Sequence, residues 1–123
     1  MATAADAFNY VKRTYDFIEY PSSTLGVEMD LGDLRTQIVF FDATESHAIF
    51  SSAFASTSDV TAEEVFQYAD ISPWGVKLVG NNYCVVHLAP LENLDISEIT
   101  SGFNLVALVA DRIEKQISNE DKY

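Results

Sequence analysis

Cysteine and histidine are both scarce in this chain of 123 residues. A single cysteine, Cys84, excludes an internal disulfide and any zinc site built from several cysteines. Its place in an apolar stretch predicts a buried structural thiol rather than a nucleophile. The only two histidines, His47 and His87, are far apart in the sequence and could meet only through the fold. The sequence therefore predicts neither a metal site nor a cofactor.

The chain also lacks long apolar runs and the sequence motifs of common active sites. No stretch approaches the roughly 20 apolar residues that a membrane helix needs, and residues 1–6 lack the basic and apolar regions of a signal peptide. There is no glycine-rich phosphate loop, no glycine-flanked serine and no EF-hand spacing of oxygen ligands. We therefore expect a cytoplasmic protein without a catalytic site, and an enzyme is only a third, weaker hypothesis.

Basic side chains are few, because 7 Lys and Arg stand against 19 Asp and Glu, for a net charge of −12. Such a surface repels phosphate backbones and anionic membranes, so neither nucleic acid nor membrane is an expected partner. Basic protein partners remain open, and so does the simpler explanation that the charge only keeps the protein soluble. Neighbouring carboxylates fall in expected turns, on a solvated strand face or in a first helical turn, which predicts structural roles rather than acid–base chemistry. These pairs are Asp30/Asp33, Asp42/Glu45 and Glu63/Glu64.

The N-terminal segment has the pattern of an amphipathic helix. Thr3, with Asp6 three residues later, is a helix start signal, and Pro21 is expected to end the helix. Between them, apolar residues recur at steps of three and four and define one helical face. These residues are Phe8, Val11, Tyr15 and Ile18.

Strict alternation follows over residues 24–31 and predicts a half-buried strand. Leu25, Val27, Met29 and Leu31 point to one face, while Glu28 and Asp30 make the other face acidic. Gly32-Asp33 predicts a two-residue hairpin turn. Further strands are expected at residues 34–41, 47–54, 75–79 and 83–88, with a short helix capped by Thr61 and Glu64 after the third strand. Val65, Phe66 and Ala69 give this helix an apolar edge, and Ser72-Pro73-Trp74-Gly75 is expected to close it.

The C-terminal part predicts a long amphipathic helix. Pro90 ends the last strand, and Asp95 with Glu98 forms a capping signal. One helical face carries an apolar stripe made of Ile99, Phe103, Val106, Ala110, Ile113 and Ile117. Beside this stripe, Leu105, Leu108 and Val109 exceed what one sheet usually covers, so we interpret them as a candidate interface of a homodimer.

The predicted fold class is α+β, with 1–123 as a single domain. The element order is α-β-β-β-α-β-β-α, in which an antiparallel sheet of about five strands carries its helices mainly on one face.

The segment Ala89-Pro90-Leu91-Glu92-Asn93-Leu94-Asp95-Ile96-Ser97-Glu98-Ile99, leading from a strand into a long helix, resembles the YbjN family. Members of that family have a Leu-Pro-Leu-Glu-like run, from which this chain departs at Ala89. Their fold is similar to that of type III secretion chaperones, and the predicted element order agrees with it. The resemblance implies a binding module without catalytic residues, and the secretion chaperones of this fold dimerise and hold an extended segment of a client.

The leading functional hypothesis is a noncatalytic protein-interaction domain, chaperone-like or regulatory, that acts as a homodimer. Its client would carry a basic or extended segment, recruited by the acidic strand face around Glu28 and Asp30. The alternative is a small-ligand sensor domain with a pocket between the sheet and the terminal helix.

Overall fold

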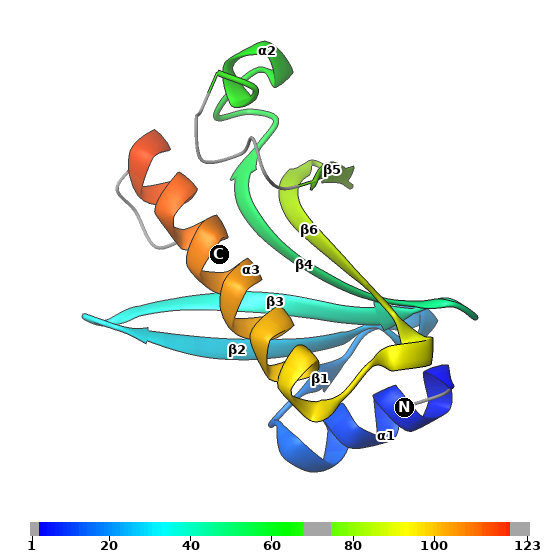
Figure 1. Cartoon of the computed structure of the whole chain (residues 1–123). Coiled ribbons are helices and arrows are strands. Elements are labelled where there is room, and N and C mark those ends of the chain that lie inside the picture. Colours follow the sequence, from blue (N-terminus) through cyan, green and yellow to red (C-terminus); the bar gives the residue numbers. More distant parts are fainter. Residues whose placement is uncertain (1–2, 68–74, 119–123) are drawn as a thin grey trace.

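The computed structural model describes residues 3–67 and 75–118. Within this part of the chain, six strands form one antiparallel sheet in the order β1-β2-β3-β4-β6-β5 (Figure 1). The strands are β1 (Ile18–Glu19), β2 (Leu25–Gly32), β3 (Arg35–Ala43), β4 (His47–Ser56), β5 (Gly75–Val79) and β6 (Asn82–Pro90); the α-helices are α1 (Ala4–Thr14), α2 (Ala62–Val65) and α3 (Ile96–Ile117). The predicted α+β class is confirmed, with one strand more than expected.

The extra strand, β1, lies where the sequence predicted the end of the first helix. Helix α1 begins as expected, because the Thr3 side chain accepts a hydrogen bond from the Asp6 N–H. It ends at Thr14, however, and Tyr15 is already extended. Ile18 therefore does not continue the helical stripe but pairs with Gly26 at the edge of the sheet, which corrects the prediction. The periodicity of the sequence could not predict β1, because its pairing depends on the free edge of β2.

The hairpin between β2 and β3 is present, with its turn shifted by one residue from the prediction. Gly32 pairs with Arg35, so the two loop residues are Asp33 and Leu34, both with positive φ. This is the backbone of a primed turn, whose twist matches the twist of the flanking strands. The Asp30 carboxylate accepts the Gly32 N–H at 2.9 Å beside a register shift, which fixes the entry to the turn.

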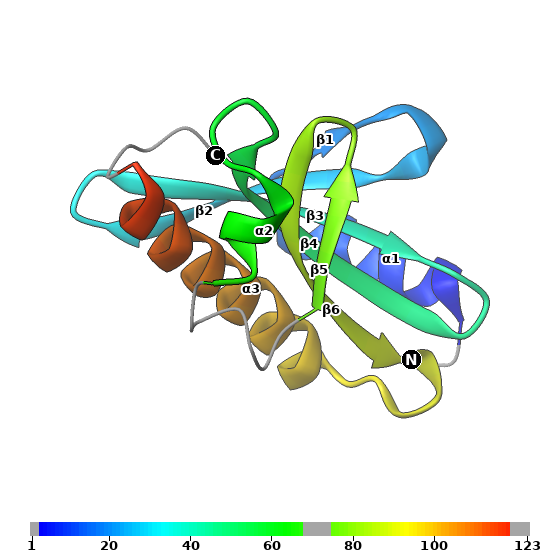
Figure 2. The ribbon, with the colours of Figure 1, turned by 90° about the horizontal axis from the view of Figure 1, so that it is seen from above.

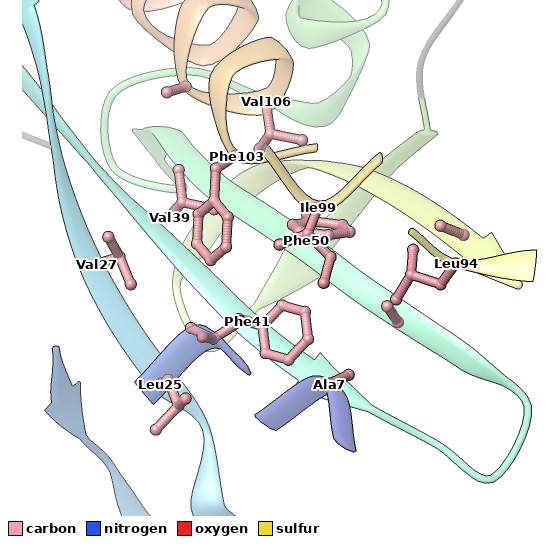
Figure 3. Close-up of a cluster of buried hydrophobic side chains, with 14 of the residues drawn as sticks. Ala7, Leu25, Val27, Val39, Phe41, Phe50, Leu94, Ile99, Phe103 and Val106 are labelled. Carbon is pink, nitrogen blue, oxygen red and sulfur yellow. The ribbon is translucent and has the colours of Figure 1, made fainter. Parts of the chain in front are cut away.

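Alternate residues of the strands face α1 and α3, and we call this side the inner face. It carries the larger core cluster, in which aromatic rings from three elements meet (Figure 3). The Phe41 ring lies 5.3 Å from the Phe50 ring and 5.9 Å from the Phe103 ring of α3. Helix α3 approaches β4 closely at Gly102, because a Cβ there would lie 2.7 Å from the Phe50 ring. The predicted stripe from Ile99 to Ile113 is buried in this interface, and Ile117 packs at its end.

A second core cluster lies under the C-terminal half of α3. It joins Phe54, Val65, Val85 and Val109, among others. Helix α2 is held by the expected reciprocal cap between Thr61 and Glu64. The helix ends at Val65, with Phe66 as its C-cap, so the predicted apolar edge loses Phe66. Ala69 and residues 72–74 of the predicted end lie outside the described residues, and Gly75 is the first residue of β5.

Candidate functional site

The opposite side of the sheet, which we call the outer face, bears none of the three α-helices of the described part. Glu28 and Asp30 are both exposed on it, as the alternation predicted. Their cross-strand partners on β3 are Ile38 and Thr36. The acidic strand face therefore exists as a surface of carboxylates beside apolar side chains.

Two hollows adjoin on the outer face and share Tyr20. The first has a volume of about 230 Å³ and is lined by Asp16, Phe17, Ile18, Tyr20, Gly26, Glu28 and Ile38. The second, of about 320 Å³, lies between Tyr20 and Pro21 at one rim and Lys77 and Val79 of β5 at the other. Figure 2 looks down on the β5–β6 hairpin, which stands well above β1 in Figure 1. Tyr20 and Pro21 follow β1 at one edge of the sheet and β5 is the other edge, so this hollow spans the sheet. The bend of the sheet therefore makes the outer face concave.

Tyr20 forms the ridge between the two hollows. Its ring lies directly over Gly26, where an added Cβ would come within 2.7 Å of Cε2. It also meets the Phe40 ring edge-on at 5.6 Å. Tyr20 is 37% exposed to solvent. An aromatic side chain that is positioned on a backbone and still exposed is typical of binding surfaces.

The candidate interface residues on α3 have different environments. Leu105 and Leu108 are 42% and 49% exposed, respectively, on the side of α3 away from the sheet. Val109 is 3% exposed and packs in the second core cluster of its own chain. Val109 therefore does not belong to the available surface, and the candidate interface narrows to the two leucines. The sequence could not distinguish Val109 from the two leucines, because the residues that bury Val109 come from α2 and β6.

The cysteine and the two histidines singled out in the sequence have three different environments. Burial raises the pKa of the Cys84 thiol to about 11, which keeps it protonated and unreactive at neutral pH. The His47 ring shares a hydrogen bond with the Ser46 hydroxyl at 2.8 Å, whereas the His87 ring lies 5.9 Å from the Phe50 ring. No group of three or more metal-ligating side chains occurs within residues 3–67 and 75–118.

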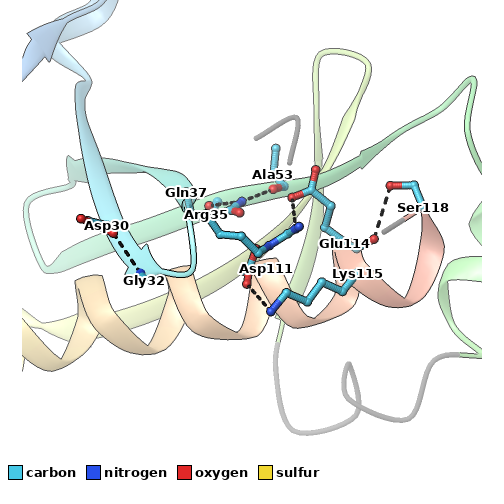
Figure 4. Close-up of polar contacts among 10 residues, drawn as sticks. Asp30, Gly32, Arg35, Gln37, Ala53, Asp111, Glu114, Lys115 and Ser118 are labelled. Carbon is cyan, nitrogen blue, oxygen red and sulfur yellow. Dashed lines mark hydrogen bonds and ion pairs between the residues drawn. The ribbon is translucent and has the colours of Figure 1, made fainter. Parts of the chain in front are cut away.

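Sequence reasoning missed an ion cluster between β3 and α3 (Figure 4). Arg35 donates to Asp111 at 2.7 Å and to Glu114 at 3.4 Å, and Lys115 lies 3.5 Å from Asp111. Glu114 is fully buried, and Arg35 and Asp111 nearly so. The partners are 76 and 79 residues apart in the chain, so no local pattern could have predicted them. This cluster links the C-terminal half of α3 to β3.

No helix of the described part is both long and apolar enough to span a bilayer. No family model, curated protein or solved structure shows significant similarity to the chain.

Proposed function

We propose that this chain is a noncatalytic protein-interaction domain, chaperone-like or regulatory, that works as a homodimer. The observation that carries the proposal is the open outer face, where exposed apolar side chains lie beside carboxylates. Phe17, Ile18 and Tyr20 are exposed next to Asp16 and Glu28 around the first hollow. Contiguous apolar surface of this kind is typical of sites that bind another protein. The resemblance to the YbjN family points in the same direction.

The dimer would form through α3. Leu105 and Leu108 are three residues apart, so they lie on one side of the helix and can pack against the same side of a second copy. In a dimer with a two-fold axis, the same surface patch of each copy contacts the other copy. Two-fold symmetry is the commonest symmetry of homodimers. Because α3 and the outer face lie on opposite sides of the sheet, both outer faces would remain accessible to clients.

The client would be an extended segment with basic and apolar side chains. Apolar groups would enter the first hollow, and Lys or Arg would lie near Asp16, Glu28 and Asp30. Opposite charges at the rim of an interface mainly accelerate association and make it salt-dependent. The acidic surface would then serve recognition as well as solubility.

Sedimentation velocity tests the dimer. We expect the wild type to sediment as a dimer at micromolar concentration, and Leu108→Asp to be a folded monomer, because it places a charge in the contact. The matched control is Asn9→Asp, which adds the same charge at an exposed position of α1, outside the proposed contact, and should leave the dimer intact. A monomeric wild type would refute the dimer. An unfolded Leu108→Asp would assign Leu108 to the core instead.

Fluorescence anisotropy tests the client site. The probe is a labelled peptide of alternating valine and lysine, compared with its valine–glutamate counterpart. We expect only the lysine peptide to bind, more weakly as salt rises, and Glu28→Gln/Asp30→Asn to weaken it about tenfold. Glu63→Gln/Glu92→Gln removes two exposed charges elsewhere and is the control. Equal losses of affinity in the two double variants would mean that only the net charge of the protein attracts the peptide. That result would contradict a client site at Glu28 and Asp30.

The sensor hypothesis placed a ligand pocket between the sheet and the terminal helix. Side chains fill the centre of that region, because Ile99, Phe103, Val106 and Ala110 of α3 are fully buried against the strands. A hollow of about 300 Å³ lies at its edge, between residues 87–90 of β6 and the first turns of α3, and its lining includes Glu98 but no lysine or arginine. A small-ligand function is therefore better supported by the second hollow of the outer face, whose lining combines apolar walls with both signs of charge.

A further inference from the structure

Most of strand β2 has no neighbouring strand on the side away from β3. Strand β1 is only two residues long and pairs with β2 at Leu25 and Gly26. Within the described residues, no strand pairs with residues 27–32 of β2 on that side, although β2 pairs with β3 along its length on the other side. An open strand edge presents backbone N–H and C=O groups to which a further strand can bond.

The backbone groups of Glu28 and Asp30 face this open edge. The Tyr20 N–H donates to the Thr24 C=O at 2.8 Å, so the C=O of Thr24 points away from β3. In an antiparallel ladder, the N–H and C=O groups of successive residues point alternately to the two sides of the strand. Those of Gly26, Glu28 and Asp30 therefore point the same way as those of Thr24. Gly26 is used by β1, whereas Glu28 and Asp30 lie beyond the end of β1.

The side chains along this edge define what a further strand would meet on each face of the sheet. Glu28 and Asp30 are exposed on the outer face. Met29 and Leu31 are half-buried and pack against the larger core cluster of the inner face. A strand that alternates basic and apolar residues matches both faces, because its basic side chains lie beside the carboxylates and its apolar side chains extend the inner face.

A second copy of the chain does not fit this edge. Antiparallel pairing of two β2 edges would place Glu28 and Asp30 of one copy beside the same carboxylates of the other copy, on one face of the sheet. Like charges directly opposite each other destabilise a strand pair, and charged side chains on an edge protect proteins against association with their own kind. The edge therefore selects against a copy of itself and in favour of a basic strand.

We infer that the client of this domain binds as an additional antiparallel strand on the open edge of β2. Its basic residues lie opposite Glu28 and Asp30 and exchange main-chain hydrogen bonds with them, while the apolar residues between them face Met29 and Leu31. Antiparallel pairing is expected because β1 uses the same edge in that direction and because it is slightly more stable per residue than parallel pairing.

This inference rests on the proposed client function and adds how the client is held. Main-chain hydrogen bonds supply the attachment, and the carboxylates choose which segment attaches. At the end next to β1, the added strand borders the first hollow, which Ile18 and Glu28 line. An apolar side chain at that end can enter the hollow. The proposed dimer is unaffected, because the edge uses no residue of α3.

Backbone methylation of the client peptide tests the strand pairing. The probe is the labelled valine–lysine peptide in two further versions, one with N-methyl groups on every lysine and one with N-methyl groups on every valine. Methylation removes the N–H donor and places a methyl group where the neighbouring strand would lie. In the antiparallel arrangement the lysine N–H groups face β2, because residues directly opposite Glu28 and Asp30 exchange both bonds. By anisotropy we expect the lysine-methylated peptide to bind about tenfold or more weakly than the unmethylated one, and the valine-methylated peptide to bind nearly as well.

A proline on the edge tests the same bonds from the protein side. Glu28→Pro removes the N–H that faces the edge, while the matched Glu28→Gln removes only the charge. Proline is tolerated on edge strands where the missing N–H faces solvent, so Glu28→Pro should keep the fold, which thermal unfolding checks. We expect Glu28→Pro to weaken binding of the unmethylated peptide about tenfold more than Glu28→Gln does. If Glu28→Pro does not fold, the methylated peptides decide the question with the wild-type protein.

Equal affinities of the two methylated peptides, or a larger loss for the valine-methylated one, would overturn the inference. A folded Glu28→Pro that binds the peptide as tightly as Glu28→Gln would also overturn it. If the unmethylated lysine peptide binds in these cases, the proposed client function stands and only the strand pairing is wrong. If the unmethylated peptide does not bind at all, the client function fails and the strand pairing fails with it.

Discussion

The inner and outer faces of the sheet are built from alternate residues of the same strands, yet their surroundings differ. On β3, Phe41 is fully buried among the Phe8, Phe50 and Phe103 rings, whereas its neighbour Phe40 is half-buried and meets the Tyr20 ring. The inner face is covered by helices and fixed by core contacts. The outer face is concave and edged with carboxylates.

This difference separates two kinds of side chain. A large inner side chain contributes free energy of folding, because its removal leaves a cavity that packed neighbours cannot fill. An outer side chain borders solvent, so its removal costs less stability and changes the shape of the hollows. The first three pairs of variants below therefore compare a position in the core or in the buried ion cluster with one on the outer face or at the surface, and the last concerns an exposed helix cap.

The largest expected effect comes from Phe41→Ala. Loss of this ring should lower the free energy of unfolding by about 3–5 kcal/mol. Phe40→Ala should cost only about 1 kcal/mol, mostly the edge-on contact with Tyr20. Urea unfolding followed by circular dichroism measures both. Equal losses of unfolding free energy would mean that the outer face is as tightly packed as the core. The proposed difference between the two faces would then be wrong.

Next in size is the ion cluster at the end of α3. Arg35→Met removes the cation that Asp111 and Glu114 share, and should cost about 2–3 kcal/mol. This is below the full cost for a buried pair, because Lys115 still lies near Asp111. The same urea titration provides the measurement.

The control for the ion cluster is Lys12→Met, which breaks the exposed 3.0 Å ion pair with Glu19 and should cost under about 0.5 kcal/mol. Adding Glu114→Gln to Arg35→Met should recover part of the loss. A cost for Arg35→Met no greater than that of the control would show that the cluster does not hold α3.

Two glycines under aromatic rings give a finer comparison. A Cβ at Gly102 would lie within 2.8 Å of three atoms of the buried Phe50 ring, so Gly102→Ala should cost about 1–2 kcal/mol despite the better helix propensity of alanine. A Cβ at Gly26 would meet Tyr20 as closely, but that ring is partly exposed and can turn aside. Gly26→Ala should therefore cost less than about 1 kcal/mol and alter both hollows. The reverse order of costs would contradict the assignment of the two faces.

The inner face was predictable because it is encoded locally. Alternation in β2 and the three- and four-residue steps of α3 are set by the geometry of a strand and a helix, and the caps at Thr61 and Asp95 are short-range signals. The acidic outer residues Glu28 and Asp30 followed from the same alternation.

The features that were missed depend on pairing between two segments, not on the residue pattern within one segment. Strand β1 forms only because β2 offers an edge, and Arg35 meets α3 only after the chain has closed the sheet. The second hollow requires the bend that brings Lys77 opposite Tyr20. Single-sequence periodicity contains no information on such pairings, so the site had to be found in the structure.

The smallest expected effect concerns a carboxylate that stabilises a helix instead of facing a hollow. Asp95 accepts the Glu98 N–H and the Ser97 hydroxyl, each at 2.8 Å, and these bonds lower its pKa below the ordinary value of 3.8. Because the folded-state pKa is depressed, the charged cap stabilises the fold above the unfolded-state value, and this contribution is lost as the pH falls through the lowered pKa. Asparagine caps helices nearly as well without the charge. The melting temperature of the wild type should therefore exceed that of Asp95→Asn at neutral pH, and the gap should close as the pH falls from about 4 downward. Glu28→Gln, which removes one charge from the outer face, controls for net charge. A gap that does not narrow as the acid range is titrated would show that the Asp95 charge does not stabilise α3.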